Sequence, residues 1–235
     1  MNTRRLIKKL GLSEEAFDRI RAAVHKAESK TTGEIAVAIT AESAHYSFWE
    51  LLFSNVAAGI ILLVLLPLSA QIESLYQRLY WNNAPTWILP FFYIVTYFAA
   101  VAITFYVSNI PAVDRLIIPR NAKRTSVTHR AMRHFAESGI YETENHSGIL
   151  IFVSYMERQV RIIADTGISR KISQDLWNII AEELSEELKN GKTSEAFCGA
   201  VKKCGELLAE QFPADKDNPN EIADGLVILE DSEWY

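Results

Sequence analysis

The feature that most constrains this chain is a pair of long segments without any charged residue. The first is 20 residues long (51–70) and the second 35 (79–113), with the second most apolar over residues 87–107. A helix of 20 residues spans about 30 Å, the thickness of a bilayer's hydrocarbon core. Helices in soluble cores are usually shorter and polar on one side, whereas these segments are apolar all round. We therefore predict transmembrane helices at about residues 50–70 and 87–108, rather than two buried core helices.

Tryptophans gather at the ends of these segments. Trp49 precedes the first span, and Trp81 and Trp87 lie between the two. Tryptophan side chains favour the interface between membrane and water. The connection between the spans is short, so the two helices must run antiparallel. We predict a two-helix transmembrane hairpin over residues 47–113, with these three tryptophans at the membrane interface.

The distribution of basic residues predicts which side of the membrane the rest of the chain occupies. Two spans place both flanks on one side, and six Lys and Arg residues against one Asp follow the second span at residues 114–133. The positive-inside rule then puts the soluble domain and both termini in the cytoplasm, at a cell (inner) membrane. The net charge of −5 argues against nucleic acid as a partner. The basic residues expected at anionic lipid headgroups, beside the N-terminal ones, are Arg115, Arg120, Lys123 and Arg124.

The two flanks together have the pattern of one α/β domain. Before the hairpin, a helix capped by Ser13 precedes a buried strand at residues 34–40. After it we predict a helix at 124–138, strands at 148–154 and 159–165, two helices starting near Ser173 and Thr193, and a strand at 226–230. This order predicts a mixed sheet with helices on its faces. The domain is therefore discontinuous, made of residues 1–46 plus 114–235, with the hairpin at 47–113 inserted.

Several short patterns resemble the TPM domain family. They are T-G-E-I at 32–35, Thr143 with Gly148 five residues later, Glu157-Arg158, and the strand and glycine turn at 160–168. Trp177, the helix end at 207–213 and N-E-I-A-D at 220–224 are similar to the bacterial integral-membrane TPM proteins. The resemblance covers nearly the whole chain.

This resemblance implies a fold and a class of role. The fold is a Rossmann-like α/β/α sandwich with a mixed sheet. The role is that of an interaction or accessory module, beside a partner membrane protein of the LemA coiled-coil type. Some extracytoplasmic relatives are acid phosphatases or calcium binders, and the predicted cytoplasmic location argues against carrying calcium binding over.

Three carboxylates are the candidates for chemistry. Asp165 ends a buried strand, and ligands of open α/β sheets gather beyond strand carboxyl ends. Glu142 and Glu144 precede the neighbouring strand and could complete a calcium or magnesium site with Asp165. Alternatively, Asp165 only caps the turn that follows it.

No common catalytic motif is present. We therefore predict a membrane-anchored module that is not an enzyme and requires no cofactor. The alternative is a calcium-assisted phosphatase, a hydrolase with Asp165 as its catalytic residue. We interpret Arg158 and Arg161 as exposed charges on the sheet, and the alternative is that they bind a phosphate. The acidic turn at 215–224 is predicted to be a solvated turn rather than an EF-hand.

Overall fold

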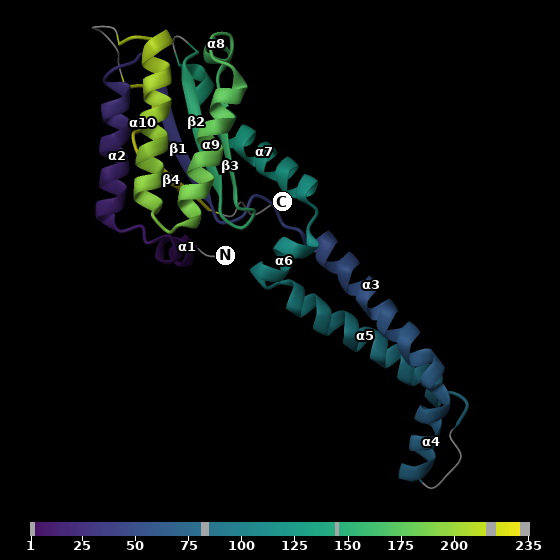
Figure 1. Cartoon of the computed structure of the whole chain (residues 1–235). Helices are drawn as coiled ribbons and strands as arrows, with labels where there is room; N and C mark the ends of the chain where they lie inside the picture. Colours follow the sequence, from purple (N-terminus) through teal and green to yellow (C-terminus); the bar gives the residue numbers. More distant parts are fainter. Residues whose placement is uncertain (1–2, 81–84, 144–145, 215–219, 231–235) are drawn as a thin grey trace. The chain divides into compact units, whose positions relative to one another are not determined.

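The computed structural model describes residues 3–80, 85–143, 146–214 and 220–230. The chain divides into two compact units (Figure 1). We call Met1–Ala44 together with Asn121–Tyr235 the α/β unit, and His45–Arg120 the hairpin unit.

The α/β unit is built on a four-stranded mixed sheet with the order β3-β2-β1-β4. Strand β1 (Glu34–Thr40) lies at its centre, parallel to both β2 (Gly148–Ser154) and β4 (Leu226–Leu229). Strand β3 (Gln159–Ala164) pairs antiparallel with β2 through a tight hairpin. The predicted mixed sheet is confirmed.

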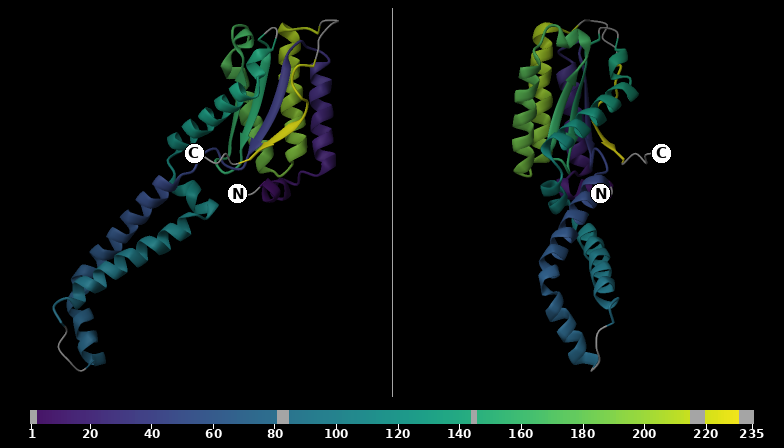
Figure 2. Two further views of the ribbon diagram at one scale, coloured as in Figure 1. Left: turned by 180° about the vertical axis from the view of Figure 1, so that it is seen from behind. Right: turned by 90° about the vertical axis from the view of Figure 1, so that its right-hand side faces the viewer.

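Helices cover both faces of this sheet (Figure 2). One face packs against α2 (Glu14–Glu28), α9 (Gln174–Lys189) and α10 (Thr193–Gln211). The other packs against α7 (Arg120–Glu137). The alternation in β1 explains the difference, because its isoleucines and valine enter the larger core while Ala36 and Ala38 face α7. Small side chains let that single helix lie close to the sheet.

The observed boundaries differ from the predicted ones by a few residues. Ser13 caps α2 as predicted, its side chain accepting a hydrogen bond from the N–H of Ala16. Helix α7 begins four residues earlier than predicted, and β3 and β4 each end one residue earlier. Short segments add α1 (Thr3–Leu10), η2 (Ile140–Glu142) and α8 (Thr166–Ser169). Helix α1 was not predicted, and it buries Leu6 completely.

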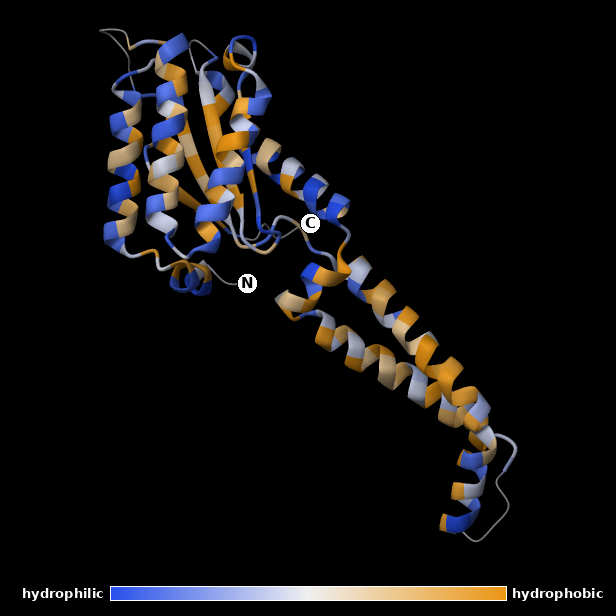
Figure 3. Ribbon diagram, in the orientation of Figure 1, coloured by the Kyte–Doolittle hydropathy of each residue, from blue (hydrophilic) through white to orange (hydrophobic). Residues whose placement is uncertain are grey.

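The hairpin unit consists of α3 (Ser47–Leu65) and α5 (Ile88–Ser108), which pack side by side, and the short α6 (Pro111–Ile117). Between the helices the hydroxyl of Tyr97 donates to Oδ1 of Asn55 at 2.7 Å. Pro67 interrupts the first helix for only one 3-10 turn, η1 (Leu66–Leu68), and α4 (Ser69–Tyr80) continues from it. The helical segment therefore extends beyond the predicted end of the first span. Helix α4 carries Glu73 and Arg78, so the apolar part is α3 with η1 (Figure 3).

Candidate functional site

Asp165 follows β3 and is buried, with its side chain 7% exposed. One carboxylate oxygen accepts from the N–H and the hydroxyl of Thr166, so the residue caps α8. The other oxygen lies 3.3 Å from Nδ1 of His146. These contacts match the alternative interpretation of the sequence, in which Asp165 caps the turn that follows it.

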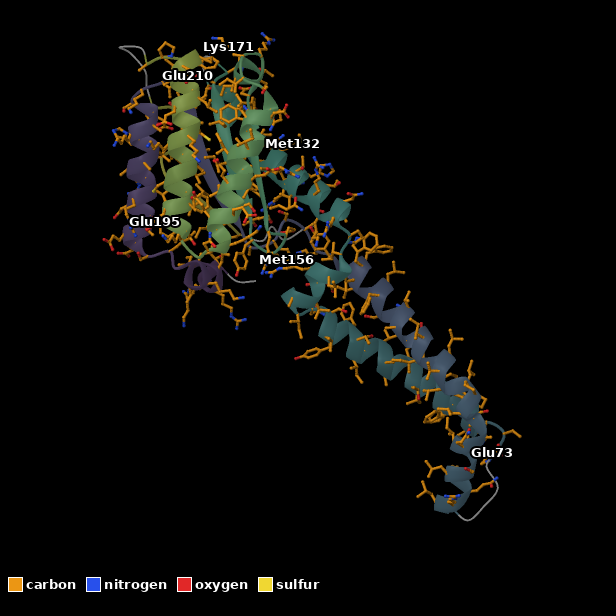
Figure 4. All side chains as sticks on the ribbon, viewed as in Figure 1. Glu73, Met132, Met156, Lys171, Glu195 and Glu210 are labelled. Carbon is orange, nitrogen blue, oxygen red and sulfur yellow. The ribbon has the colours of Figure 1, made fainter. Side chains whose placement is uncertain are left out.

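The direction of β3 determines which end of the sheet holds Asp165. Ala164 pairs with Ile149 near the beginning of β2, and Gly148 pairs with Glu34 at the beginning of β1. Asp165 therefore lies at the amino ends of the parallel strands, not at the carboxyl ends where ligands of open sheets collect. Figure 4 marks this end of the α/β unit by Lys171.

The structure shows the contacts of one of the other two predicted carboxylates, Glu142. Glu142 is exposed, and its carboxylate accepts from the hydroxyl of its neighbour Tyr141 at 2.9 Å. Glu144 lies outside the described residues. Within the described ranges, no three His, Cys, Asp or Glu side chains are arranged to hold a metal ion.

The capping role gives a direct prediction. Asp165→Ala should lower the free energy of unfolding by about 1 kcal/mol, because α8 loses its N-cap acceptor. Asp165→Asn should cost less, since asparagine also caps helices. Denaturant titration of the full chain in mild detergent measures both. A loss for Asn as large as that for Ala would mean that the charge of Asp165, and not its capping geometry, matters.

A second group of carboxylates lies beside the amino end of β1 and is largely buried. Glu28, the last residue of α2, accepts from the N–H of Ile35 at 2.8 Å. Glu34 is 2% exposed and accepts from the N–H of Ile222. Asp224 accepts from Nδ2 of Asn220 at 2.7 Å. We call Glu28, Glu34 and Asp224 the acidic clasp, because they join α2, β1 and the segment before β4.

The clasp changes the acidity of its members. The pKa of Glu28 is raised to about 8, mainly by burial; the hydrogen bond from the N–H of Ile35 opposes this rise, and the charges of Glu34 and Asp224 contribute to it. Burial also raises the pKa of Glu34. Glu28 is consequently protonated at neutral pH and can share a hydrogen bond with Asp224. The family patterns at 32–35 and 220–224 contain two of its members, but the sequence does not reveal that α2 adds the third.

The two arginines considered for a phosphate site lie apart. Arg161 extends on the α7 side of the sheet, where its Nε donates to the hydroxyl of Thr128, and burial lowers its pKa. Arg158 lies in the β2–β3 turn, exposed to solvent. They do not form a joint site.

Many apolar side chains of the hairpin unit are exposed, and Figure 3 colours α3 and α5 as mostly hydrophobic. Two helices are long and apolar enough to span a membrane, Ser47–Leu79 and Ile88–Ser108, and only 11% and 0% of their most apolar windows are buried. Leu63 is 68% exposed on α3, and Phe98 is 65% exposed on α5. A soluble protein rarely exposes apolar area on this scale.

The residues predicted at the membrane interface differ in exposure. Trp87 is 60% exposed and Trp49 is half-buried, while Trp81 lies outside the described residues. Arg120 and Arg124 are exposed and Arg115 is half-buried. Lys123 is 9% exposed, which leaves little of its side chain for a headgroup.

The fold and the motifs agree with comparisons to known proteins. Residues 112–207 match the family model of the TPM domain, so the chain contains a TPM domain. The fold is similar to the NMR structure of the BA42 protein from the psychrophilic bacterium Bizionia argentinensis sp. nov. The TM-score is 0.54 at 18% identity, over 92% of this chain and 94% of that one. No curated protein sequence matches the chain.

Proposed function

We propose that this protein is a membrane-anchored TPM-domain module that acts through a partner in or at the bilayer. The observation that carries the proposal is the outward-facing apolar surface of α3 and α5, inserted between β1 and α7 of one α/β domain. Lipid is the solvent that this surface requires, because water around it would cost about 25 cal/mol for every Å² of apolar area. The hydrogen bond between Asn55 and Tyr97 satisfies polar groups that would otherwise face lipid.

The excess of basic residues after the second span supports a cytoplasmic α/β unit. Arg120 and Arg124 are exposed in α7 and suit anionic headgroups. The proposed membrane location and the family resemblance support membership of the bacterial integral-membrane TPM proteins, with a cell-membrane partner of the LemA coiled-coil type as the first candidate.

An accessory role is favoured over the phosphatase alternative by the contacts of Asp165. Its carboxylate is occupied by the N–H of Thr166 and the ring of His146, and Glu142 is bonded to Tyr141. A calcium-assisted phosphatase would need these carboxylates within about 2.3–2.6 Å of one ion. Calcium or magnesium is therefore not part of the proposed role.

Crosslinking in intact cells tests the proposal. An amine-reactive crosslinker that crosses the membrane should join the full chain to a membrane protein through exposed lysines of the α/β unit. A reagent of the same reactivity that cannot cross the membrane should give no adduct. An adduct with the impermeant reagent at those lysines would mean that the α/β unit lies outside the cytoplasm. The absence of any specific adduct with the permeant reagent would contradict the interaction role.

A further inference from the structure

Helix α1 has one face buried in the α/β unit and one face that is basic. Leu6 is completely buried in the larger core, and Ile7 and Leu10 pack against the same core. The outer face, which we call the basic face of α1, carries four exposed cations and no acidic residue. These cations are Arg4, Arg5, Lys8 and Lys9. Because the α/β unit already covers the apolar face, α1 has only its charges to offer to a partner.

Contacts at the carboxyl end of the sheet determine where α1 lies. Nζ of Lys9 is 5.9 Å from the centre of the Tyr155 ring, and Tyr155 directly follows β2. The backbone N–H of Tyr155 donates to the carbonyl oxygen of Thr40, the last residue of β1, at 3.0 Å. Figure 1 shows α1 at this end of the sheet and α8 at the other.

The chain leaves the α/β unit at this same end. Strand β1 ends at Thr40, and the first segment of the unit ends four residues later at Ala44. Four residues reach at most about 14 Å. The proposed membrane anchor follows directly in the sequence, so the carboxyl end of β1 is the end of the unit that is nearest to the anchor along the chain.

The positive charge at this end is carried mainly by α1. Lys189, the last residue of α9, pairs with Glu186, whereas Arg158 in the β2–β3 turn is exposed. Glu14 and Glu15 follow α1 in the sequence but belong to the first turn of α2, where they offset the positive end of that helix. The basic face of α1 is therefore a local source of positive potential in a chain whose net charge is −5.

We infer that the basic face of α1 binds anionic lipid headgroups, so that the carboxyl ends of β1 and β2 point toward the bilayer. This inference rests on the proposed membrane anchor. Basic side chains close to an anionic bilayer are attracted to it. A helix that is already packed on a folded domain loses little conformational freedom when it binds, unlike a flexible basic tail. Asp165 and the acidic clasp, at the amino ends of the strands, then face away from the lipid.

The composition of the basic face favours a lipid surface over a protein partner. The central part of a protein interface is usually depleted of charge and contains apolar or aromatic anchors. The apolar residues of α1, Leu6, Ile7 and Leu10, are instead directed into the core of the α/β unit. A row of cations without an apolar anchor fits a surface that presents many anions.

Fluorescence quenching of the full chain in nanodiscs tests this inference. A fluorophore is attached to Thr3→Cys in a Cys198→Ser background, in which Cys204 is buried and does not react, and the lipids carry a nitroxide on their headgroups. Equal parts of phosphatidylglycerol and phosphatidylcholine should quench the fluorophore about twofold more than phosphatidylcholine alone. The same fluorophore at Glu210→Cys, near the amino ends of the strands (Figure 4), should be quenched equally weakly in both lipids.

Two double variants distinguish the basic face of α1 from net charge. Arg5→Gln with Lys8→Gln should reduce the quenching at Thr3→Cys to its level in phosphatidylcholine alone. Lys202→Gln with Lys203→Gln is the matched control, because it removes the same charge from α10, where both lysines are ion-paired. This control should leave the quenching unchanged. Salt at about 1 M, which shortens the Debye length to about 3 Å, should abolish the extra quenching without any substitution.

The inference is overturned if anionic lipid does not increase the quenching at Thr3→Cys. It is equally overturned if the extra quenching persists in high salt or in Arg5→Gln with Lys8→Gln. A chain that does not elute with the nanodisc contradicts the membrane anchor, and this inference with it. A chain that enters the nanodisc without extra quenching contradicts only the inference.

Discussion

Replacing Gly148 with alanine should destabilise the α/β unit by about 3 kcal/mol, the upper end of the usual cost of overpacking a core. Gly148 is the first residue of β2, and a Cβ built there would lie 2.2 Å from the carbonyl oxygen of Ile140 and 2.7 Å from its Cγ2. Ile140 is completely buried in η2, so the backbone has no room to move away. The glycine at position 148, five residues after Thr143, thus has a steric cause.

The buried thiol of Cys204 provides the measurement. Cys204 is 0% exposed in α10, so it reacts only when the α/β unit opens. In a Cys198→Ser background, Gly148→Ala should speed its labelling by a thiol reagent about a hundredfold. Gly199→Ala is the control, because its Cβ would meet only Glu187 at 3.6 Å and alanine favours the helix. Equal labelling rates for the two variants would refute the steric account.

Replacing Glu28 with glutamine should stabilise the protein at pH 8 by about 2 kcal/mol and change little at pH 4.5. The pKa of Glu28 is about 8 in the folded chain against an ordinary value of 4.5. Between these values the folded protein keeps a proton that the unfolded chain releases, so the free energy of unfolding falls as the pH rises. The carboxyl is not wholly removed from solvent, which keeps the effect below that of a fully buried group. Glutamine keeps the acceptor for Ile35 and has no charge to bury.

Denaturant titrations of the full chain between pH 4.5 and 8 test this result. The natural protein should lose stability across this interval, and Glu28→Gln should lose distinctly less. Glu210→Gln changes an exposed position of α10. Its free energy of unfolding should fall with pH as steeply as that of the natural protein. If the free energy of unfolding of Glu28→Gln fell with pH as steeply as that of the natural protein, the acidic clasp would not hold a proton at Glu28.

The elements of the fold follow from local patterns in the sequence. Strand β1 was predictable because its seven residues alternate large and small apolar side chains, and all seven are buried. The two long helices were predictable because apolar residues surround them on every side. Helix α1 was not, because its four basic residues conceal the single buried Leu6.

The candidate site was less predictable because it depends on strand direction. Asp165 follows β3 whether that strand runs parallel or antiparallel to β2. Only the antiparallel pairing of β3 places Asp165 at the amino ends of β1 and β2. The acidic clasp joins segments that are distant in sequence, such as Glu28 with Asp224. Patterns within one segment do not report such contacts.

Alkaline extraction of membranes from cells that express the full chain tests the role of α3 and α5 most directly. Val56 and Phe98 are 54% and 65% exposed at the centres of α3 and α5, and an arginine at each position costs about 2.5–3.5 kcal/mol in a bilayer. The natural chain should stay in the membrane pellet and float with lipid, while the variant with both arginines should be extracted. Recovery of the natural chain in the soluble fraction would contradict the membrane anchor.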